Sequence, residues 1–250
     1  MVKNLRLNLA IVFVMGVAPL MTLGQQAMSQ ARPQSRAGQP VFSVDGPGER
    51  IENIDDLKKE LKAYHACTCK CGCYTHDLDV QADKAVAFLR RRAAHVRPNE
   101  KLAMVFDIDE TSLSNWTVLV QEDFTYDKKA SEAWEETGQA PVIPGSLRVE
   151  QEAERLGVAV FFITGRPERE REATEQNLKA QGFGGWQQLS LRSAAMEAKM
   201  AEEYKSSVRG EIAAQGYKIV LNVGDQWSDL KGKPEAEYSV KYPNPFYLIP

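Results

Sequence analysis

This sequence carries little net charge. Its 250 residues include 31 lysines and arginines against 34 aspartates and glutamates, which gives a formal net charge of −3 at pH 7. Proteins that bind nucleic acid need a basic face, and this balance does not supply one, so we expect no nucleic-acid partner. The one basic cluster, Arg90-Arg91-Arg92 with Arg97, lies in a helix-like stretch and is interpreted as a solvated helix face.

Long hydrophobic runs are also absent, apart from one near the N-terminus. Leu9 to Leu23 is apolar except for Thr22, but it is shorter than the about 20 residues that a membrane-spanning helix needs. Lys3 and Arg6 precede this run, and small residues follow at Thr22, Gly24, Ala27 and Ser29. This order is typical of a signal peptide, which we place at residues 1–30. We therefore expect an exported protein, periplasmic or secreted, with no stable membrane insertion after signal removal. A retained N-terminal anchor is the alternative.

Histidine and cysteine are scarce, and they are gathered in one place. All four cysteines lie between Cys67 and Cys73 at alternate positions, and two of the three histidines, His65 and His76, flank them. An even number of cysteines in an exported protein predicts disulfides, although four thiols with histidines nearby could instead bind a soft metal or stay reduced. The sequence suggests no partner for His65, His76 or His95. We assign the cysteine cluster no catalytic part.

A flexible segment separates the signal peptide from the rest of the chain. Residues 31–50 are rich in Pro, Gly, Ser and Gln and have few large apolar side chains, which is typical of a linker. The remaining residues, 51–250, are enough for one domain with a sizeable core.

From Lys101 onward, short apolar runs alternate with amphipathic stretches. We expect strands at 102–108, 158–163, 188–191 and 218–223, and helices at 146–156, 168–181 and 197–214. Two further stretches with helical spacing precede them, at 53–64 and 77–94. The alternation predicts an α/β fold in which a parallel sheet has helices on both faces.

One insertion interrupts this alternation, at about residues 112–144. It follows the first strand and is well placed to act as a lid over a site at the strand end. It contains four aromatic residues, Trp116, Phe124, Tyr126 and Trp134, which are better interpreted as packing than as substrate contacts.

Two carboxylates leave the first strand together. Asp107 and Asp109 come directly after the apolar run Leu102–Phe106, and in open α/β sheets ligands bind beyond the carboxyl ends of such strands. Like charges this close raise one pKa or recruit a cation. Asp-x-Asp alone is usually a turn or a helix cap, so a functional interpretation needs matching polar residues at the later strand ends.

Polar residues at two later strand ends complete a candidate phosphoryl-transfer site. Thr164 comes after the second strand and could bind phosphate oxygens, although it could also cap the next helix. Lys205 could balance phosphate charge, with Lys199 as a rival. Asp225 and Asp229 come after the fourth strand, and Asp229 could be a structural acceptor instead of a ligand. Mg2+ suits such an oxygen-rich set together with a phosphate.

These motifs, in this order, resemble the haloacid dehalogenase (HAD) superfamily. Asp107-Ile108-Asp109-Glu110-Thr111, Ile163–Arg166, Lys205 and Gly224–Asp229 are similar to its four motifs. Tyr204–Arg209 and Tyr242–Tyr247 are similar to one branch, the subfamily IIIB acid phosphatases, which include plant vegetative storage proteins and bacterial non-specific acid phosphatases. The resemblance runs from about Ile51 to the C-terminus. It implies a HAD-like Rossmannoid sheet with a small helical cap insertion and N-terminal helices.

The resemblance also implies roles for individual residues. Asp107 would be the nucleophile that forms an aspartyl-phosphate, and Asp109 the general acid and then the base. Thr164 and Lys205 would bind phosphate. Mg2+ would be held by Asp107, the backbone carbonyl of Asp109, Asp225 and, directly or through water, Asp229. The expected activity is hydrolysis of small phosphomonoesters by an acid phosphatase.

The chain departs from the family pattern at Cys71-Gly72-Cys73-Tyr74, where relatives have a serine-glycine-tyrosine stretch. Some storage-protein relatives lack the nucleophilic aspartate, which this chain keeps, and this favours an active enzyme. The alternatives are a storage or binding protein with little turnover, a phosphotransferase, and a nucleotide-specific phosphatase.

Overall fold

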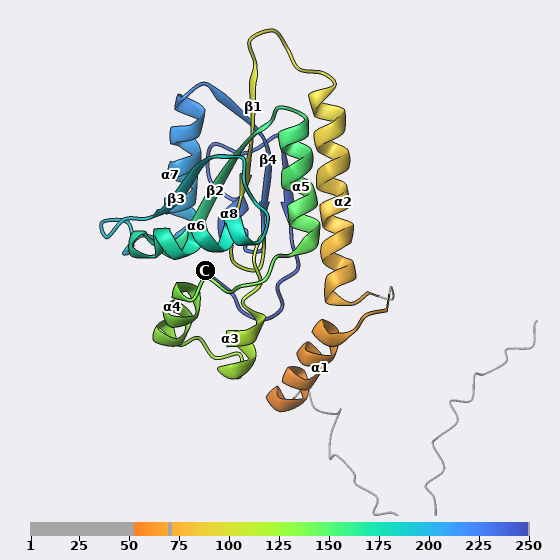
Figure 1. Cartoon of the computed structure of the whole chain (residues 1–250), viewed down its shortest axis with the longest axis vertical. Coiled ribbons are helices and arrows are strands. Elements are labelled where there is room, and N and C mark those ends of the chain that lie inside the picture. The colour runs from red at the N-terminus through yellow and green to blue at the C-terminus, as the bar shows by residue number, and fades with distance from the viewer. Residues whose placement is uncertain (1–52, 70–71, 250) are drawn as a thin grey trace, which may run out of the picture. The chain divides into compact units, whose positions relative to one another are not determined.

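The computed structural model describes residues 53–69 and 72–249 (Figure 1). The predicted signal peptide and linker lie outside these residues. The described part begins with two helices, α1 (Ile54–Ala66) and α2 (Tyr74–Ala93), as the helical spacing predicted. None of the helices in the described ranges is long and apolar enough to cross a bilayer.

Five parallel strands form a sheet in the order β3-β2-β1-β4-β5. The strands are β1 (Lys101–Phe106), β2 (Ala159–Pro167), β3 (Trp186–Arg192), β4 (Tyr217–Gly224) and β5 (Tyr238–Lys241). β1 lies at the centre, and all its residues except the first are buried. Because both its faces are covered, its sequence is an unbroken apolar run. β5 was not predicted from the sequence, because it has only four residues and Val240 is its one buried residue.

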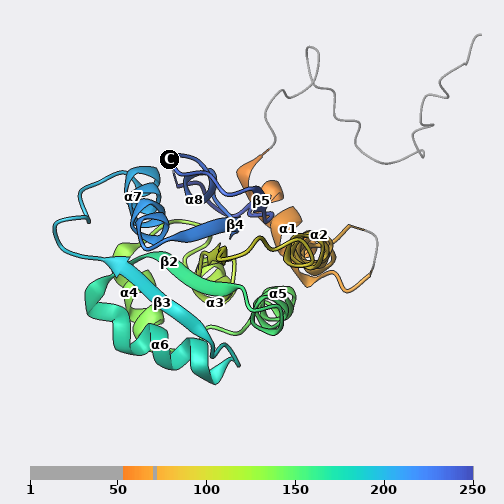
Figure 2. The same cartoon turned by 90° about the horizontal axis from the view of Figure 1, so that it is seen from above.

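Different helices cover the two faces of the sheet (Figure 2). The helices are α5 (Pro144–Arg155), α6 (Arg171–Ala180) and α7 (Ala201–Ala214). Phe161 and Ile163 of β2 pack in one cluster with residues of α7. Phe162, between them, belongs to a second cluster with residues of α2, α5 and α6. This alternation follows from the two-residue period of a strand. The predicted α/β architecture with helices on both faces is confirmed.

The segment between β1 and α5 lies beyond the carboxyl ends of the strands (Figure 1). It contains two short helices, α3 (Trp116–Gln121) and α4 (Lys128–Glu136). Trp116, Phe124 and Trp134 are partly buried against the main core, as the packing interpretation predicted. That interpretation is wrong for Tyr126, which is 76% exposed.

His65 lies in the last turn of α1, and Cys67, Cys69 and Cys73 follow it before the start of α2. His65 has a partner that the sequence did not suggest: its ring stacks on Trp116 with 3.6 Å between centroids and 2° between planes. Cys69 is disulfide-bonded, which favours the first of the three alternatives for the cluster. The Cys67 sulfur lies 3.0 Å from that of Cys69, and the buried Cys73 thiol donates to the Cys69 carbonyl at 2.5 Å.

Candidate active site

Three buried aspartates meet at the carboxyl edge of the sheet. Asp107 comes after β1, Asp225 comes after β4, and Asp229 lies on the short helix α8 (Trp227–Leu230). One carboxylate oxygen from each of the three lies within 4.8 Å of the others. Gly224 permits this approach, because a Cβ there would overlap the side chain of Asp229. The predicted convergence of separate strand ends is therefore present in the structure.

Lys205 reaches this group from α7. Its Nζ donates to Asp107 Oδ1 and to Asp229 Oδ1, each at 2.5 Å. Burial alone would lower the pKa of Lys205, but the two carboxylates outweigh it and raise that pKa. The rival Lys199 pairs with Glu203 at the surface, where 38% of its side chain is exposed against 8% for Lys205. Lys205, and not Lys199, therefore lies in the site.

The donor chemistry of this group fits a hard divalent cation. Burial, assisted by the neighbouring carboxylates, raises the pKa of Asp107 well above its usual range despite the opposing effect of Lys205. Burial followed by the charge of Asp229 raises the pKa of Asp225 to about 7. Buried carboxylates with raised pKa values gain from a positive charge between them, and oxygen ligands suit Mg2+ or a similar ion.

Side chains around Asp225 hold its carboxylate in place. Thr111 Oγ1 donates to Asp225 Oδ1 at 3.2 Å, while Gln226 Nε2 and Asn244 Nδ2 each donate to Oδ2 at 2.6 Å. Asp229 is held in turn by the Gln226 backbone N–H, which donates to Oδ2 at 2.8 Å in a capping box. Asp229 therefore has a structural role as an acceptor, and its carboxylate also belongs to the three-aspartate group.

Asp109 faces a different set of partners. Arg166 donates to Asp109 Oδ1 through Nη2 at 2.6 Å and Nε at 3.0 Å. Asn115 Nδ2 donates to the same oxygen at 2.8 Å, and Thr164 Oγ1 donates to Oδ2 at 3.3 Å. Burial would raise the pKa of Asp109, but the charge and hydrogen bonds of Arg166 outweigh it and lower that pKa. The carboxylate of Asp109 therefore lies apart from the three-aspartate group.

Thr164 is buried beside Asp109 and lies within β2, which continues beyond the predicted strand end at Ile163 to Pro167. Its hydroxyl accepts from the Arg166 backbone N–H at 3.1 Å. The next helices along the chain, η1 (Glu168–Glu170) and α6, have Pro167 and Glu170 at their N-cap positions. Thr164 is therefore not their cap, and the helix-capping alternative is wrong.

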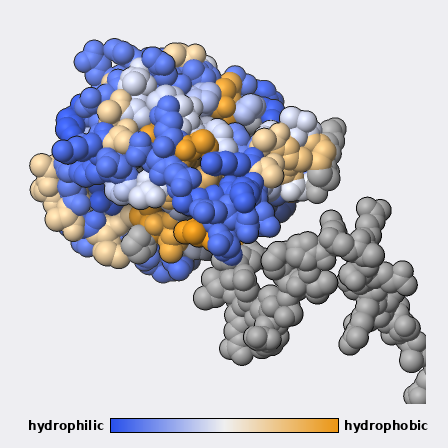
Figure 3. Space-filling model, turned by 90° about the horizontal axis from the view of Figure 1, so that it is seen from below, coloured by the Kyte–Doolittle hydropathy of each residue, from blue (hydrophilic) through white to orange (hydrophobic). Residues whose placement is uncertain are grey.

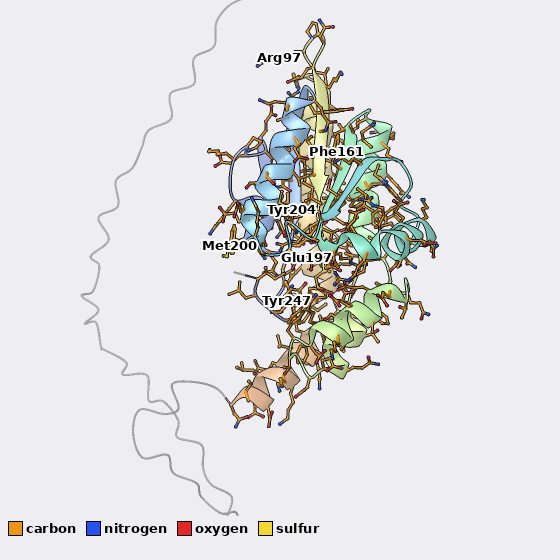
Figure 4. All side chains as sticks on the ribbon, turned by 90° about the vertical axis from the view of Figure 1, so that its left-hand side faces the viewer. Arg97, Phe161, Glu197, Met200, Tyr204 and Tyr247 are labelled. Carbon is orange, nitrogen blue, oxygen red and sulfur yellow. The ribbon has the colours of Figure 1, made fainter. Side chains whose placement is uncertain are left out.

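The residues at the site for which the sequence suggested no role include Glu110, Asn115 and Arg166. Glu110 has φ +52° and 1% exposure, and burial raises its pKa to about 7. It accepts hydrogen bonds from the Tyr247 hydroxyl at 2.8 Å and the Asn115 backbone N–H at 2.5 Å. In Figure 4, Arg97 lies at the top of the described part of the chain, and Tyr247 lies below its middle, above α1. Arg166 stood in the Thr-Gly-Arg motif, which was the one signal for it.

The parallel sheet, the aspartates clustered at its strand ends and the buried lysine are the features expected of a phosphoryl-transfer enzyme. The chain belongs to the HAD superfamily, subfamily IIIB (acid phosphatase), whose family model matches residues 43–250. It is 38% identical to acid phosphatase 1 of Solanum lycopersicum over 184 residues, which are 70% of this chain and 69% of that protein. It is 29% identical to vegetative storage protein 1 of Arabidopsis thaliana, over 80% of this chain and 74% of that protein.

A solved structure has the same fold. The class C acid phosphatase from Bacillus anthracis superposes with a TM-score of 0.64 at 22% identity, covering 78% of this chain and 86% of that one. The predicted HAD-like fold is thus confirmed, and acid phosphatase is confirmed as the enzyme class of the family.

Proposed function

We propose that this protein hydrolyses small phosphomonoesters in a Mg2+-dependent reaction through an aspartyl-phosphate at Asp107. The observation that carries the proposal is the meeting of Asp107, Asp225 and Asp229 at one point, where Asp107 and Asp229 also contact the ammonium group of Lys205. Phosphoryl transfer requires mainly positioning and neutralisation of charge, and this set can supply both. The surface beyond the strand ends is mainly hydrophilic, with small separate hydrophobic patches, which suits a charged substrate (Figure 3).

In the first half of the reaction a carboxylate oxygen of Asp107 attacks phosphorus. The bond from phosphorus to the ester oxygen breaks, and that oxygen takes a proton from Asp109. In the second half Asp109, now ionised, takes a proton from a water molecule that attacks phosphorus. The bond to Asp107 then breaks and inorganic phosphate leaves. Lys205 and Thr164 bind the phosphoryl oxygens in both halves.

Asp107, Asp225, Asp229 and the Asp109 backbone carbonyl would hold the metal ion. When bound, Mg2+ supplies positive charge that keeps these carboxylates ionised and offsets the charge of the phosphate. Without the metal's charge, burial raises the pKa of Asp107, whereas Arg166 outweighs burial and lowers the pKa of Asp109; a nucleophile and a general acid need the opposite shifts. An incoming phosphate dianion beside Asp109 would raise the pKa of that carboxyl group.

The expected result of metal removal is loss of activity. After treatment with a chelator, release of the phenol from an aryl phosphate should fall by at least roughly 100-fold, because the aspartates and the substrate phosphate then lack the positive charge of the metal ion. Added Mg2+ should restore the rate. The same assay distinguishes the enzyme from a storage protein of the same fold, which would show little turnover with or without Mg2+. Full activity in excess chelator would contradict the metal requirement.

Asp109→Asn should affect poor leaving groups most. Asn cannot donate an acidic proton, so kcat/KM for an alkyl phosphate should fall by roughly 100-fold or more, whereas an aryl phosphate, whose leaving group needs less protonation, should lose less. The measurement is the ratio of the two kcat/KM values in wild type and variant. An equal loss for both substrates would argue against the general-acid role.

We also propose, from the N-terminal sequence, that residues 1–30 are a signal peptide, residues 31–50 a linker, and that the protein acts after export. Residues 51–250 then form the catalytic domain, and the insertion at about 112–144 is its cap. The location of α3 and α4 beyond the strand ends supports the cap assignment.

A further inference from the structure

Two hydrogen bonds in series link helix α4 to the side chain of Asp109. The indole N–H of Trp134 donates to Asn115 Oδ1 at 2.9 Å, and Asn115 Nδ2 donates to Asp109 Oδ1 at 2.8 Å. Asn115 is 6% exposed and lies just before α3. The two hydrogen bonds therefore connect Trp134 on α4, through the buried amide of Asn115, to Asp109, whose carboxyl group is proposed as the general acid.

The chemistry of the donors sets the direction of these two hydrogen bonds. An indole can only donate, so the oxygen of the Asn115 amide must face Trp134. The amide nitrogen then faces Asp109, which accepts when it is ionised. A flipped amide would place its oxygen against the carboxylate of Asp109 and its nitrogen against the indole N–H, losing both bonds. Trp134 thus selects the one orientation in which Asn115 can donate to Asp109.

No helix-capping role accounts for the Asn115 side chain. Asn115 is the N-cap residue of α3, but its side chain makes no capping hydrogen bond. Its amide nitrogen is directed to carboxylates, at 2.8 Å from Asp109 Oδ1 and 3.4 Å from Glu110 Oε2. The amide nitrogen of Asn115 therefore donates to the acidic groups of the site, and the side chain does not cap the helix.

Asp109 is held from two elements. Arg166 and Thr164 reach it from β2, and Asn115 reaches it from the loop before α3. Removal of the Asn115 contact would leave the carboxyl group to the partners on β2 alone, where the forked guanidinium of Arg166 binds it most strongly. Its orientation toward a leaving group would then be set mainly by Arg166, whose own link to α4 is the longer contact between Nε and Glu135 Oε2, at 4.0 Å.

We propose that Asn115 positions the Asp109 carboxyl group for proton transfer, and that Trp134 on α4 fixes the orientation of Asn115. This inference rests on the proposed general-acid role of Asp109. Asn115 and Trp134 are positioning residues: they act through Asp109 and take no part in bond breaking. The position of α4 is thereby coupled to the step in which the leaving group departs.

The test uses Trp134→Phe, which keeps an aromatic ring and removes the N–H, and Asn115→Ala, which removes the amide. We expect the ratio of kcat/KM for an alkyl phosphate to that for an aryl phosphate to fall by roughly 3- to 10-fold in Trp134→Phe and by more in Asn115→Ala. A purely structural role would lower both values equally, because the transferred phosphoryl group is the same in both substrates.

Trp116→Phe is the matched control. Trp116 lies next to Asn115 and stacks on His65, and within the described residues its indole N–H makes no hydrogen bond to a carboxylate. The ratio in this variant should equal that of wild type. If Asp109→Asn lowers the ratio but both test variants leave it unchanged, with or without an equal loss of activity on the two substrates, the inference is overturned. If Asp109→Asn itself left the ratio unchanged, the proposed role of Asp109 would fail instead.

Discussion

Asp107→Asn is expected to abolish hydrolysis of phosphomonoesters, with a loss of at least roughly 1,000-fold in kcat for an aryl phosphate. An amide oxygen is a poor nucleophile, and it cannot form the aspartyl-phosphate that the second half of the reaction hydrolyses. The loss should apply equally to aryl and alkyl phosphates, unlike that of Asp109→Asn, because both substrates transfer the same phosphoryl group to Asp107. Steady-state assays with the two substrates provide the measurement.

The control for this variant is its thermal unfolding without metal. Burial and the neighbouring carboxylates raise the pKa of Asp107, so an uncharged amide of the same shape should not lower the melting temperature. Lys205 would keep its second partner, Asp229. Turnover close to that of wild type in a folded Asp107→Asn protein would remove the covalent mechanism.

Lys205→Met should produce the second large effect. The methionine fills a similar volume but leaves Asp107 and Asp229 without the ammonium group that each contacts at 2.5 Å. Because the phosphoryl oxygens lose the positive charge of this ammonium group, kcat/KM for any phosphomonoester should fall by roughly 100- to 10,000-fold. Lys199→Met is the matched control, because Lys199 pairs with Glu203 at the surface, and its activity should stay close to wild type.

Lys205→Met should also change how stability depends on pH. The pKa values of Asp107 and Asp225 are already raised by burial, and loss of the ammonium group should raise that of Asp107 further. Carboxyl groups with raised pKa values contribute stability that is present below their unfolded pKa and lost as pH rises through the folded pKa. Without metal, the melting temperature of the variant should therefore fall further below that of wild type as the pH rises from mildly acidic to neutral. Added Mg2+ should reduce this difference. A melting difference that does not depend on pH would contradict this assignment of charge.

Much of the fold could be predicted from the sequence because its signals are local. The central strand β1 is apolar after its first residue, since both faces are covered, and the alternation of strands with amphipathic helices defines the parallel sheet. β5 was missed because four residues with one buried side chain do not make a distinct pattern. The helices α3 and α4 could be placed in an insertion but not delimited, because each is short.

For the candidate site, position along the strands predicted more than residue type. Asp107, Asp225 and Asp229 could be brought together from the sequence, since the carboxyl ends of parallel strands share one edge of the sheet. The choice of Lys205 over Lys199 depended on family context, and burial on α7 now accounts for it physically. Asn115 and Trp134 could not be linked to Asp109, because their contacts cross between separate loops and helices.

The sequence by itself determined the α/β class, the family and the aspartates at the strand ends, because these depend on periodicity and on the order of motifs along the chain. Only the tertiary structure decided the burial, the neighbouring charges and hence the pKa of each aspartate. It buried Asp107 among carboxylates and raised its pKa, and it placed Asp109 against Arg166 and lowered its pKa. A pKa depends on burial and on charges brought close by folding, and neighbours in space are not neighbours in the sequence.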